Sequence, residues 1–190
     1  MQQAVPVGVG AMAAILGLNA NEVESLANDA ALGEICVIAN DNSPGQIVLS
    51  GHKGAIERAI ALAPERGAKR AIPLDVSAPF HCSLMKPAAR LMETAFKDTP
   101  MNEAQKPIMS NVTAMPAKEN TLIRSLLVEQ VTARVRWREI GLNLGNLGVT
   151  NVVEIGAGKV LTGLIKRIDP GLNAIAINTP EEMNTFLKTL

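Results

Sequence analysis

The feature that most restricts the fold is a helix start signal directly behind an apolar run. Met12 to Leu18 is apolar and could form a strand or a helix by propensity alone. Asn19 follows it, and Glu22 stands three residues further on, which is the pattern of a capping box. The run before Asn19 is therefore interpreted as a strand. The residues that follow at helical spacing are apolar: Val23, Leu26, Ala27 and Ala30.

The next sixty residues complete a recognisable supersecondary order. Two short β-prone runs are joined by a turn-rich stretch from Asn40 to Gly45, so they are expected to form a hairpin with a rather long loop. The predicted elements are strands at 12–18, 34–39, 46–49 and 71–76, and helices that begin at Asn19 and span Lys53–Arg66. This β-α-β-β-α-β order is the ferredoxin-like split motif, and it predicts a complete small subdomain over residues 1–78.

The second half, residues 79–190, alternates strands and helices in a different rhythm. Strands are expected around residues 109, 153 and 175, and helices at 84–97, 122–130, 137–147 and 159–168. A last helix begins with Thr179 and Pro180. In the helix 84–97, the side chains predicted to face inward are Leu84, Ala88, Leu91, Met92 and Ala95. The alternation of strands and helices predicts an α/β fold with a parallel sheet. Because only three strands are expected, this half is interpreted as part of a larger subdomain.

Charge and composition exclude several classes of function. Eighteen Lys and Arg balance eighteen Asp and Glu, and they are scattered, which argues against binding to nucleic acid or to a membrane surface. Cys36 and Cys82 have no spacing typical of a disulfide framework or a metal cluster. No apolar run is long enough to span a bilayer. A cytoplasmic protein without a metal site is expected.

His81 is the first candidate for chemistry. It lies in Asp75-Val76-Ser77-Ala78-Pro79-Phe80-His81, where Pro79 favours extended backbone at the residue before it. The histidine is therefore expected between a strand end and a helix start, where rigid elements could hold a general base. A structural histidine on the surface or in the core is the alternative.

Three other features are weaker candidates for a functional role than His81. Gly8-Val9-Gly10-Ala11-Met12-Ala13 matches a dinucleotide fingerprint formally, but no full strand precedes it and no full helix opens behind it. His52 is expected to begin a surface helix in a solvated role. Cys82 is next to His81 in sequence, and adjacent residues rarely meet in attack geometry, so a small buried residue is expected there.

Five stretches together resemble one family. They are Met1-Gln2-Gln3-Ala4-Val5-Pro6 with Gly10-Ala11-Met12; Asn40 to Gln46; Val76 to His81; Ser110-Asn111-Val112-Thr113; and Glu154 to Leu164. They resemble bacterial malonyl-CoA:acyl-carrier-protein transacylases and, more distantly, the acyltransferase domains of polyketide synthases. The resemblance covers the whole chain and the C-terminal three-fifths of the family enzyme. It implies a ferredoxin-like subdomain inserted in an α/β-hydrolase-like one.

The resemblance also implies an activity and a site. The family transfers malonyl from coenzyme A to the phosphopantetheine thiol of acyl carrier protein through an acyl-serine, without a resident cofactor and commonly as a monomer. His81 matches the catalytic base, and Gln130 matches the residue whose backbone carbonyl accepts the imidazole N–H. The acyl pocket is matched by Met1, Met12, Phe80 and Val160, and the entrance for coenzyme A and the carrier arm by Asn40 and Asn42.

The departures from the family pattern bear on activity. No Gly-x-Ser-x-Gly elbow occurs in the sequence, and the family's carboxylate-binding arginine and oxyanion-hole glutamine have no counterpart. Three interpretations stay open. They are a transferase whose N-terminal part is absent from this sequence, a non-catalytic module that binds coenzyme A or carrier protein, and a mis-started reading frame. In the first, the chain is inactive alone and exposes apolar surface in its second half.

Overall fold

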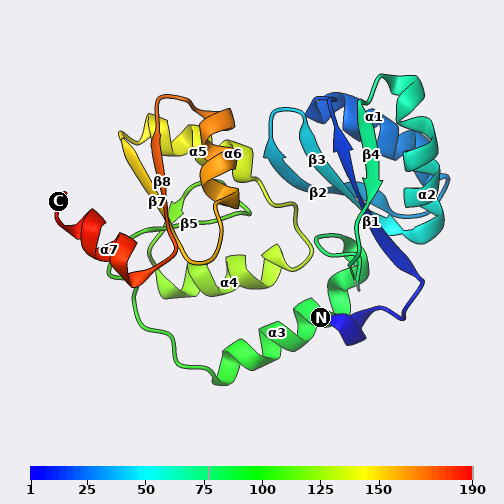
Figure 1. Cartoon of the computed structure of the whole chain (residues 1–190). Helices are drawn as coiled ribbons and strands as arrows, with labels where there is room; N and C mark the ends of the chain where they lie inside the picture. Colours follow the sequence, from blue (N-terminus) through cyan, green and yellow to red (C-terminus); the bar gives the residue numbers. More distant parts are fainter. Residues whose placement is uncertain (77, 190) are drawn as a thin grey trace. The chain divides into compact units, whose positions relative to one another are not determined.

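The computed structural model describes residues 1–76 and 78–189, apart from the side chain of Gln2. Ser77, in the stretch before His81, and Leu190, the last residue of the chain, lie outside the described residues. The chain forms two compact units, Met1–Ile140 and Gly141–Leu190, and the boundary between them falls within α5 (Figure 1). The division into residues 1–78 and 79–190 stays a prediction.

The first unit contains a four-stranded antiparallel sheet with the strand order β2-β3-β1-β4. The elements follow one another as β1 (Gly10–Leu16), α1 (Ala20–Ala31), β2 (Cys36–Ser43), β3 (Gln46–His52), α2 (Lys53–Leu62) and β4 (Arg70–Pro73). This is the predicted β-α-β-β-α-β order. Strand β1 is an inner strand, because it pairs with β3 on one side and β4 on the other, and Met12 of β1 lies opposite Ser50 of β3.

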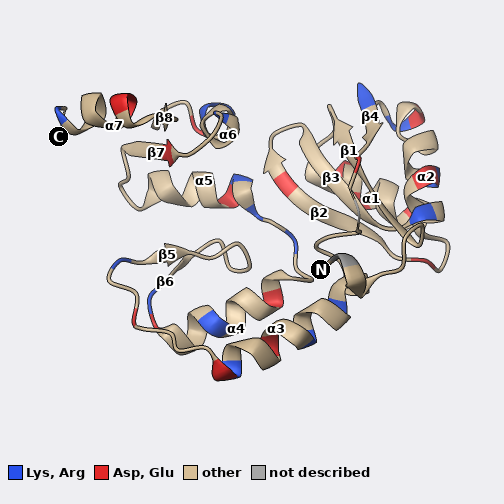
Figure 2. Ribbon diagram, turned by 60° about the horizontal axis from the view of Figure 1, so that its bottom comes forward, with Lys and Arg blue, Asp and Glu red and all other residues tan. Residues whose placement is uncertain are grey.

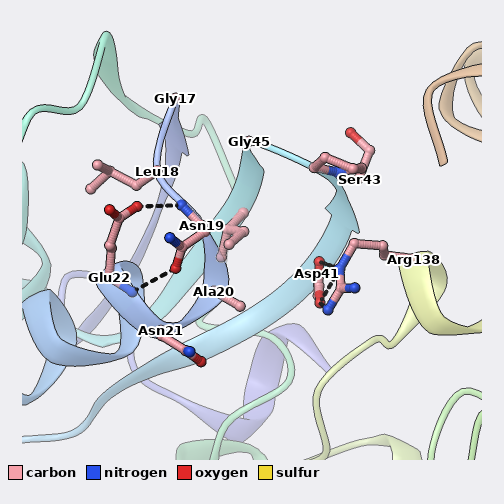
Figure 3. A pocket seen from close by; sticks show the side chains of 12 residues that line it. Gly17, Leu18, Asn19, Ala20, Asn21, Glu22, Asp41, Ser43, Gly45 and Arg138 are labelled. Carbon is pink, nitrogen blue, oxygen red and sulfur yellow. Dashed lines mark hydrogen bonds and ion pairs between the residues drawn. The ribbon is translucent and has the colours of Figure 1, made fainter.

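Helices α1 and α2 share one hydrophobic core with the sheet. The capping box predicted at the start of α1 is present, because Asn19 Oδ1 accepts from the Glu22 N–H and Glu22 Oε2 accepts from the Asn19 N–H (Figure 3). The predicted apolar face of α1 is buried, and its members are Val23, Leu26, Ala27 and Ala30. They pack against residues of α2 and of three strands in a single cluster.

The predicted bounds of two elements, strand β2 and helix α2, were wrong. The stretch Asn40 to Ser43 was expected in a loop, but it continues strand β2, and only Pro44 and Gly45 form the turn. Two register irregularities let this polar edge strand bend while it stays paired with β3. Helix α2 ends at Leu62 rather than Arg66, because Pro64 cannot continue it, and a short 3-10 turn spans Pro64–Arg66.

The segment that carries His81 lies against the start of β1. A Cβ on Gly10 would lie 2.3 Å from the Pro79 ring, so glycine is what allows this close approach. After a 3-10 turn at Ser83–Met85, helix α3 (Lys86–Asp98) begins with a proline in its first turn. Phe80, Met85 and Ala88 pack with Val5 from the N-terminal stretch, next to the 3-10 turn Gln2–Ala4.

The inward face predicted for α3 was largely wrong. Ala88 is buried and Leu84 is half-buried, but Leu91 is 73% exposed, and Met92 and Ala95 are exposed as well. The helical period was predicted correctly, but a period says only which residues share a face. It does not say whether another element covers that face. Acidic and basic residues are interspersed along α3 (Figure 2).

The rest of the first unit is a short hairpin and a helix. Strand β5 (Ile108–Met109) pairs antiparallel with β6 (Pro116–Ala117), a partner that the sequence did not indicate. The strand expected around residue 109 is therefore shorter than predicted, and its pairing in the described structure is not parallel. Helix α4 (Asn120–Gln130) follows, and six residues separate it from α5 (Trp137–Asn146).

The second unit contains a parallel strand pair, as predicted. Strands β7 (Asn151–Ile155) and β8 (Asn173–Ile177) pair in parallel through α6 (Val160–Ile168), and α7 (Pro180–Leu187) closes the chain. Thr179 caps α7 through the Glu182 N–H. No helix in the described ranges is long and apolar enough to cross a membrane.

Candidate active site

His81 has an unusual backbone and a well-defined side chain. Its φ is 58°, in the left-handed region that non-glycine residues rarely adopt. Its imidazole Nδ1 lies 3.2 Å from the carbonyl oxygen of Gln130 and 3.1 Å from that of Ala133. Backbone strain of this kind persists where surrounding contacts hold it, and it concentrates at functional sites.

The two carbonyls determine which nitrogen carries the proton. A carbonyl oxygen can only accept, so Nδ1 must donate and Nε2 is left with its lone pair. Among the residues that the structure describes, Nε2 has no hydrogen-bond partner. The ring is therefore oriented as a general base requires, with a basic nitrogen available. The contact with Gln130 was implied by the family resemblance, whereas that with Ala133 was not.

The predicted pocket residues of the first unit are only partly brought together. Met12 is buried on the sheet face opposite α1 and α2, in a cluster with Ala39, Val48 and the half-buried Phe80. Phe80 also belongs to the cluster at the start of α3, so it links the sheet to the segment of His81. Met1 is 56% exposed. The role of these residues in binding an acyl group stays a prediction.

Asn40 lies beside the segment that supplies the carbonyls. The Val135 N–H donates to Ala39 O at 2.8 Å, and the Asp41 N–H donates to Val135 O at 2.9 Å, which forms an isolated parallel bridge between Asn40 and Val135. Asn40 and Asn42 are both half-buried on β2. No local pattern indicated this bridge, because it joins residues 95 positions apart (135 − 40).

An ion pair next to that bridge was also missed by the sequence analysis. The Asp41 carboxylate, with 1% of its side chain exposed, accepts from Arg138 Nε at 2.9 and 3.0 Å and from Nη2 at 2.8 Å (Figure 3). This hydrogen bond raises the pKa of Arg138. The pair borders a cavity of about 540 Å³ that is lined by the β2–β3 turn and the start of α1. None of the predicted site residues lines this cavity.

Val160, the remaining predicted pocket residue, belongs to the second unit. It is the first residue of α6 and is 71% exposed. Glu154 of β7 holds the first turn of this helix, because its carboxylate accepts the N–H groups of Leu161 at 3.1 Å and Thr162 at 2.7 Å. These bonds lower the pKa of Glu154. No group of three or more potential metal ligands occurs within 1–76 and 78–189.

The expectation of a solvated His52 was wrong. Its Nδ1 accepts the N–H of Ile35 at 2.9 Å, and its own backbone N–H donates to Ile35 O at 2.8 Å. The ring therefore helps to hold the start of β2 against the end of β3. Because Nδ1 accepts, the proton of the neutral ring is on Nε2. The two histidines of the sequence thus have opposite tautomers.

Comparison with known proteins identifies the relatives of this fold and site. The chain is 45% identical over 184 residues to the malonyl CoA-acyl carrier protein transacylase of Haemophilus influenzae, covering 97% of this chain and 59% of that protein. The Bacillus subtilis protein of the same name is 44% identical over 191 residues, covering 100% and 60%. The chain is homologous to malonyl CoA-acyl carrier protein transacylases. No family model matches it.

Solved transacylase structures have the same fold. The acyl carrier protein S-malonyltransferase of Vibrio cholerae superposes with a TM-score of 0.95 at 44% identity and covers 98% of this chain. A malonyl-transacylase in complex with a type II polyketide-synthase acyl-carrier protein gives a TM-score of 0.96 at 41% identity and covers all of this chain. The chain spans about three-fifths of the length of these transacylases, and the matched part is C-terminal.

Neither cysteine of this transacylase relative is suited to act as a nucleophile. Cys82 is 1% exposed, and its Sγ donates to Pro79 O at 3.2 Å. Burial raises its pKa, and burial also raises the pKa of Cys36 to about 11. Since the thiolate is the reactive form, both thiols are expected to be unreactive near neutral pH.

Thiol labelling tests this expectation directly. At about pH 8, a pKa of about 11 leaves on the order of one Cys36 thiol in a thousand ionised, and burial blocks access as well. We expect an aromatic disulfide reagent to label neither cysteine in the folded chain and both in denaturant. Rapid stoichiometric labelling of Cys82 in the folded chain would contradict the burial described above.

Proposed function

We propose that this chain supplies the general base for transfer of a malonyl group from coenzyme A to the thiol of acyl carrier protein. The observation that carries the proposal is the imidazole of His81, which is held through Nδ1 by the carbonyls of Gln130 and Ala133. Homology to proteins named for this reaction supports the choice of substrate. In this proposal malonyl-CoA is a substrate, and no resident cofactor is needed.

The proposed chemistry is proton transfer at Nε2 of His81. A serine hydroxyl would attack the thioester carbonyl while Nε2 takes its proton, and the proton would then pass to the departing coenzyme A thiol. In the second half, Nε2 would take the proton of the phosphopantetheine thiol as its sulfur attacks the acyl-serine carbonyl, and would return this proton to the departing serine oxygen. Two neutral carbonyls orient the ring here in place of a carboxylate, so no negative charge is added beside an anionic malonyl group.

We further propose that the serine comes from outside these 190 residues. The printed sequence contains no Gly-x-Ser-x-Gly elbow, and a base without a nucleophile and an oxyanion hole cannot carry out acyl transfer. On this proposal the β-α-β-β-α-β part is a ferredoxin-like subdomain. The part that follows it is the C-terminal portion of an α/β-hydrolase-like subdomain.

The carrier protein as a partner rests on one related structure. A malonyl-transacylase at 41% identity has been solved with an acyl-carrier protein bound, and we propose the same class of partner for this chain. The competing function is a module that binds coenzyme A or carrier protein without chemistry. The strained, tautomer-fixed His81 favours the catalytic function, because a binding surface has no need of a basic imidazole nitrogen.

A complementation experiment separates the two functions. The chain is mixed with malonyl-CoA, alone or with the N-terminal two-fifths of the Haemophilus influenzae relative as a separate polypeptide, and each polypeptide is weighed by intact mass spectrometry. We expect no adduct on the chain alone and a malonyl adduct on the added polypeptide. His81→Ala in the complemented pair is expected to slow transfer by about 10²–10⁴.

The control is Asp29→Asn, which removes an exposed ion pair with Arg66 and should leave transfer unchanged. Binding of carrier protein to the complemented pair, with no transfer in either the unmodified chain or the variants, would favour the non-catalytic module. A malonyl adduct on the chain by itself would show that the nucleophile is within these residues.

A further inference from the structure

The carbonyls that orient His81 belong to the end of α4 and the turn behind it. Gln130 is the last residue of α4, and Ala133 lies in the turn that follows it. Within this turn the N–H groups of Thr132 and Ala133 both donate to Glu129 O at 3.1 Å. These bonds shape the turn locally, and Val131 within it packs against the cluster at the start of α3. A further contact ties the turn to the sheet.

The contact is made with β2, the edge strand of the sheet. Val135 forms both backbone bonds of the bridge to Ala39 and Asp41, at 2.8 and 2.9 Å. Three residues further on, Arg138 binds the carboxylate of the same Asp41 with two nitrogens. Asp41 is thus bonded to this segment by its backbone N–H and by its side chain, and it is almost fully buried.

The same sheet also holds the segment of His81 itself. Pro79 lies against Gly10 at the start of β1, at a distance that excludes any side chain on residue 10. Phe80 packs on the sheet beside Met12. The donor and the acceptors of these hydrogen bonds are therefore held by the same sheet. The segment of His81 contacts β1, and the segment of the carbonyls is bonded to β2.

The geometry points to Asp41 and Arg138 as positioning residues for His81. They hold the turn at Gln130 and Ala133 so that its carbonyls keep the proton on Nδ1 and leave Nε2 as the base. This role rests on the proposed function of His81. The structural part of it, the fixed tautomer, is a property of the chain itself and is measurable without any substrate.

The two histidines make the measurement simple. A long-range proton–nitrogen NMR spectrum at about pH 8.5, where a free imidazole is neutral, shows which ring nitrogen carries the proton. We expect His81 to be protonated at Nδ1 and His52 at Nε2. In Asp41→Asn and in Arg138→Gln, we expect the ratio of the Nδ1-protonated to the Nε2-protonated tautomer of His81 to fall by roughly tenfold, as for the loss of one hydrogen bond. The His52 signals should not move.

His52 serves as the control for folding, since its Nδ1 bond depends on β2 and β3 being paired. Asp29→Asn is the matched control, because it breaks an ion pair in the same unit that is exposed and distant in sequence from the turn. Arg138→Lys keeps the charge but not the two-nitrogen contact, so it should give an intermediate ratio. If a variant disturbs His52 as well, Arg138→Lys provides the milder test.

An unchanged His81 tautomer in Asp41→Asn and Arg138→Gln, with His52 intact, would overturn the positioning role. That result is distinct from a failure of the proposed function. If complementation yields no transfer while the tautomer responds as expected, the positioning holds and the catalytic function of His81 is wrong.

Discussion

Gly51→Ala is expected to cost the first unit roughly 3 kcal/mol or more of unfolding free energy, at or above the upper end of overpacking effects. A Cβ on residue 51 would lie 1.8 Å from the carbonyl oxygen of Ile35 and 2.6 Å from its carbon. These are backbone atoms in the hairpin of β2 and β3, so neither can rotate away. The strands must separate locally, and the bond from the His52 N–H to Ile35 O is lost with them.

Urea unfolding followed by the fluorescence of Trp137 measures this loss, because the only tryptophan lies in the first unit. The comparison is Gly163→Ala in the exposed middle of α6, where nothing lies within 4 Å of the added Cβ. That change is expected to stabilise the helix by about 0.5–1 kcal/mol, judged by circular dichroism. Equal midpoints for Gly51→Ala and the unmodified chain would mean that β2 and β3 are not packed as described.

Leu26→Ala and Leu91→Ala are expected to differ by several kcal/mol although both change leucine to alanine in a helix. Leu26 of α1 is fully buried in the main core, so its truncation removes apolar contacts and leaves a cavity, at a cost of about 2–5 kcal/mol. Leu91 of α3 is 73% exposed. Its truncation should change the unfolding free energy by about 0.5 kcal/mol or less.

The same urea titration reports both variants, since both residues belong to the first unit. The helix propensities of leucine and alanine are close, so the contrast isolates burial. A loss of 2 kcal/mol or more at Leu91 would show that the α3 face is covered in solution. Sedimentation at increasing concentration would then distinguish self-association from a different packing of α3.

Local signals in the sequence predicted the elements that local chemistry controls. Asn19 and Glu22 placed the start of α1, and Thr179 with Pro180 placed the start of α7. The periodicity of Val23 to Ala30 predicted a face that the sheet covers. The same reasoning was wrong for Leu91, because periodicity specifies a face and only tertiary structure supplies its cover.

The candidate site shows the same difference between what could be predicted from the sequence and what depends on tertiary structure. The resemblance to a family identified His81 and Gln130, and their contact is present in the structure. The pair of Asp41 and Arg138 gave no signal, because charged residues in a turn-like stretch and at a helix start normally indicate solvent exposure. Asn40 to Ser43 was interpreted as a loop on the same grounds. The carboxylate of Asp41 within it is bound by Arg138, almost a hundred residues away, which no local pattern reports.

The separations between these partners have a consequence for folding. The sheet and its two helices are complete by residue 73, and strands β2 and β3 pair over a turn of two residues, Pro44 and Gly45. The bonds to His81 close loops of 49 and 52 residues, and the ion pair of Asp41 closes one of 97. Because closing long loops costs chain entropy before any contact forms, the hairpin of β2 and β3 is expected to form before the ion pair of Asp41 with Arg138. The imidazole then acquires its orientation late, once α4 and the turn behind it have docked on an already formed edge strand.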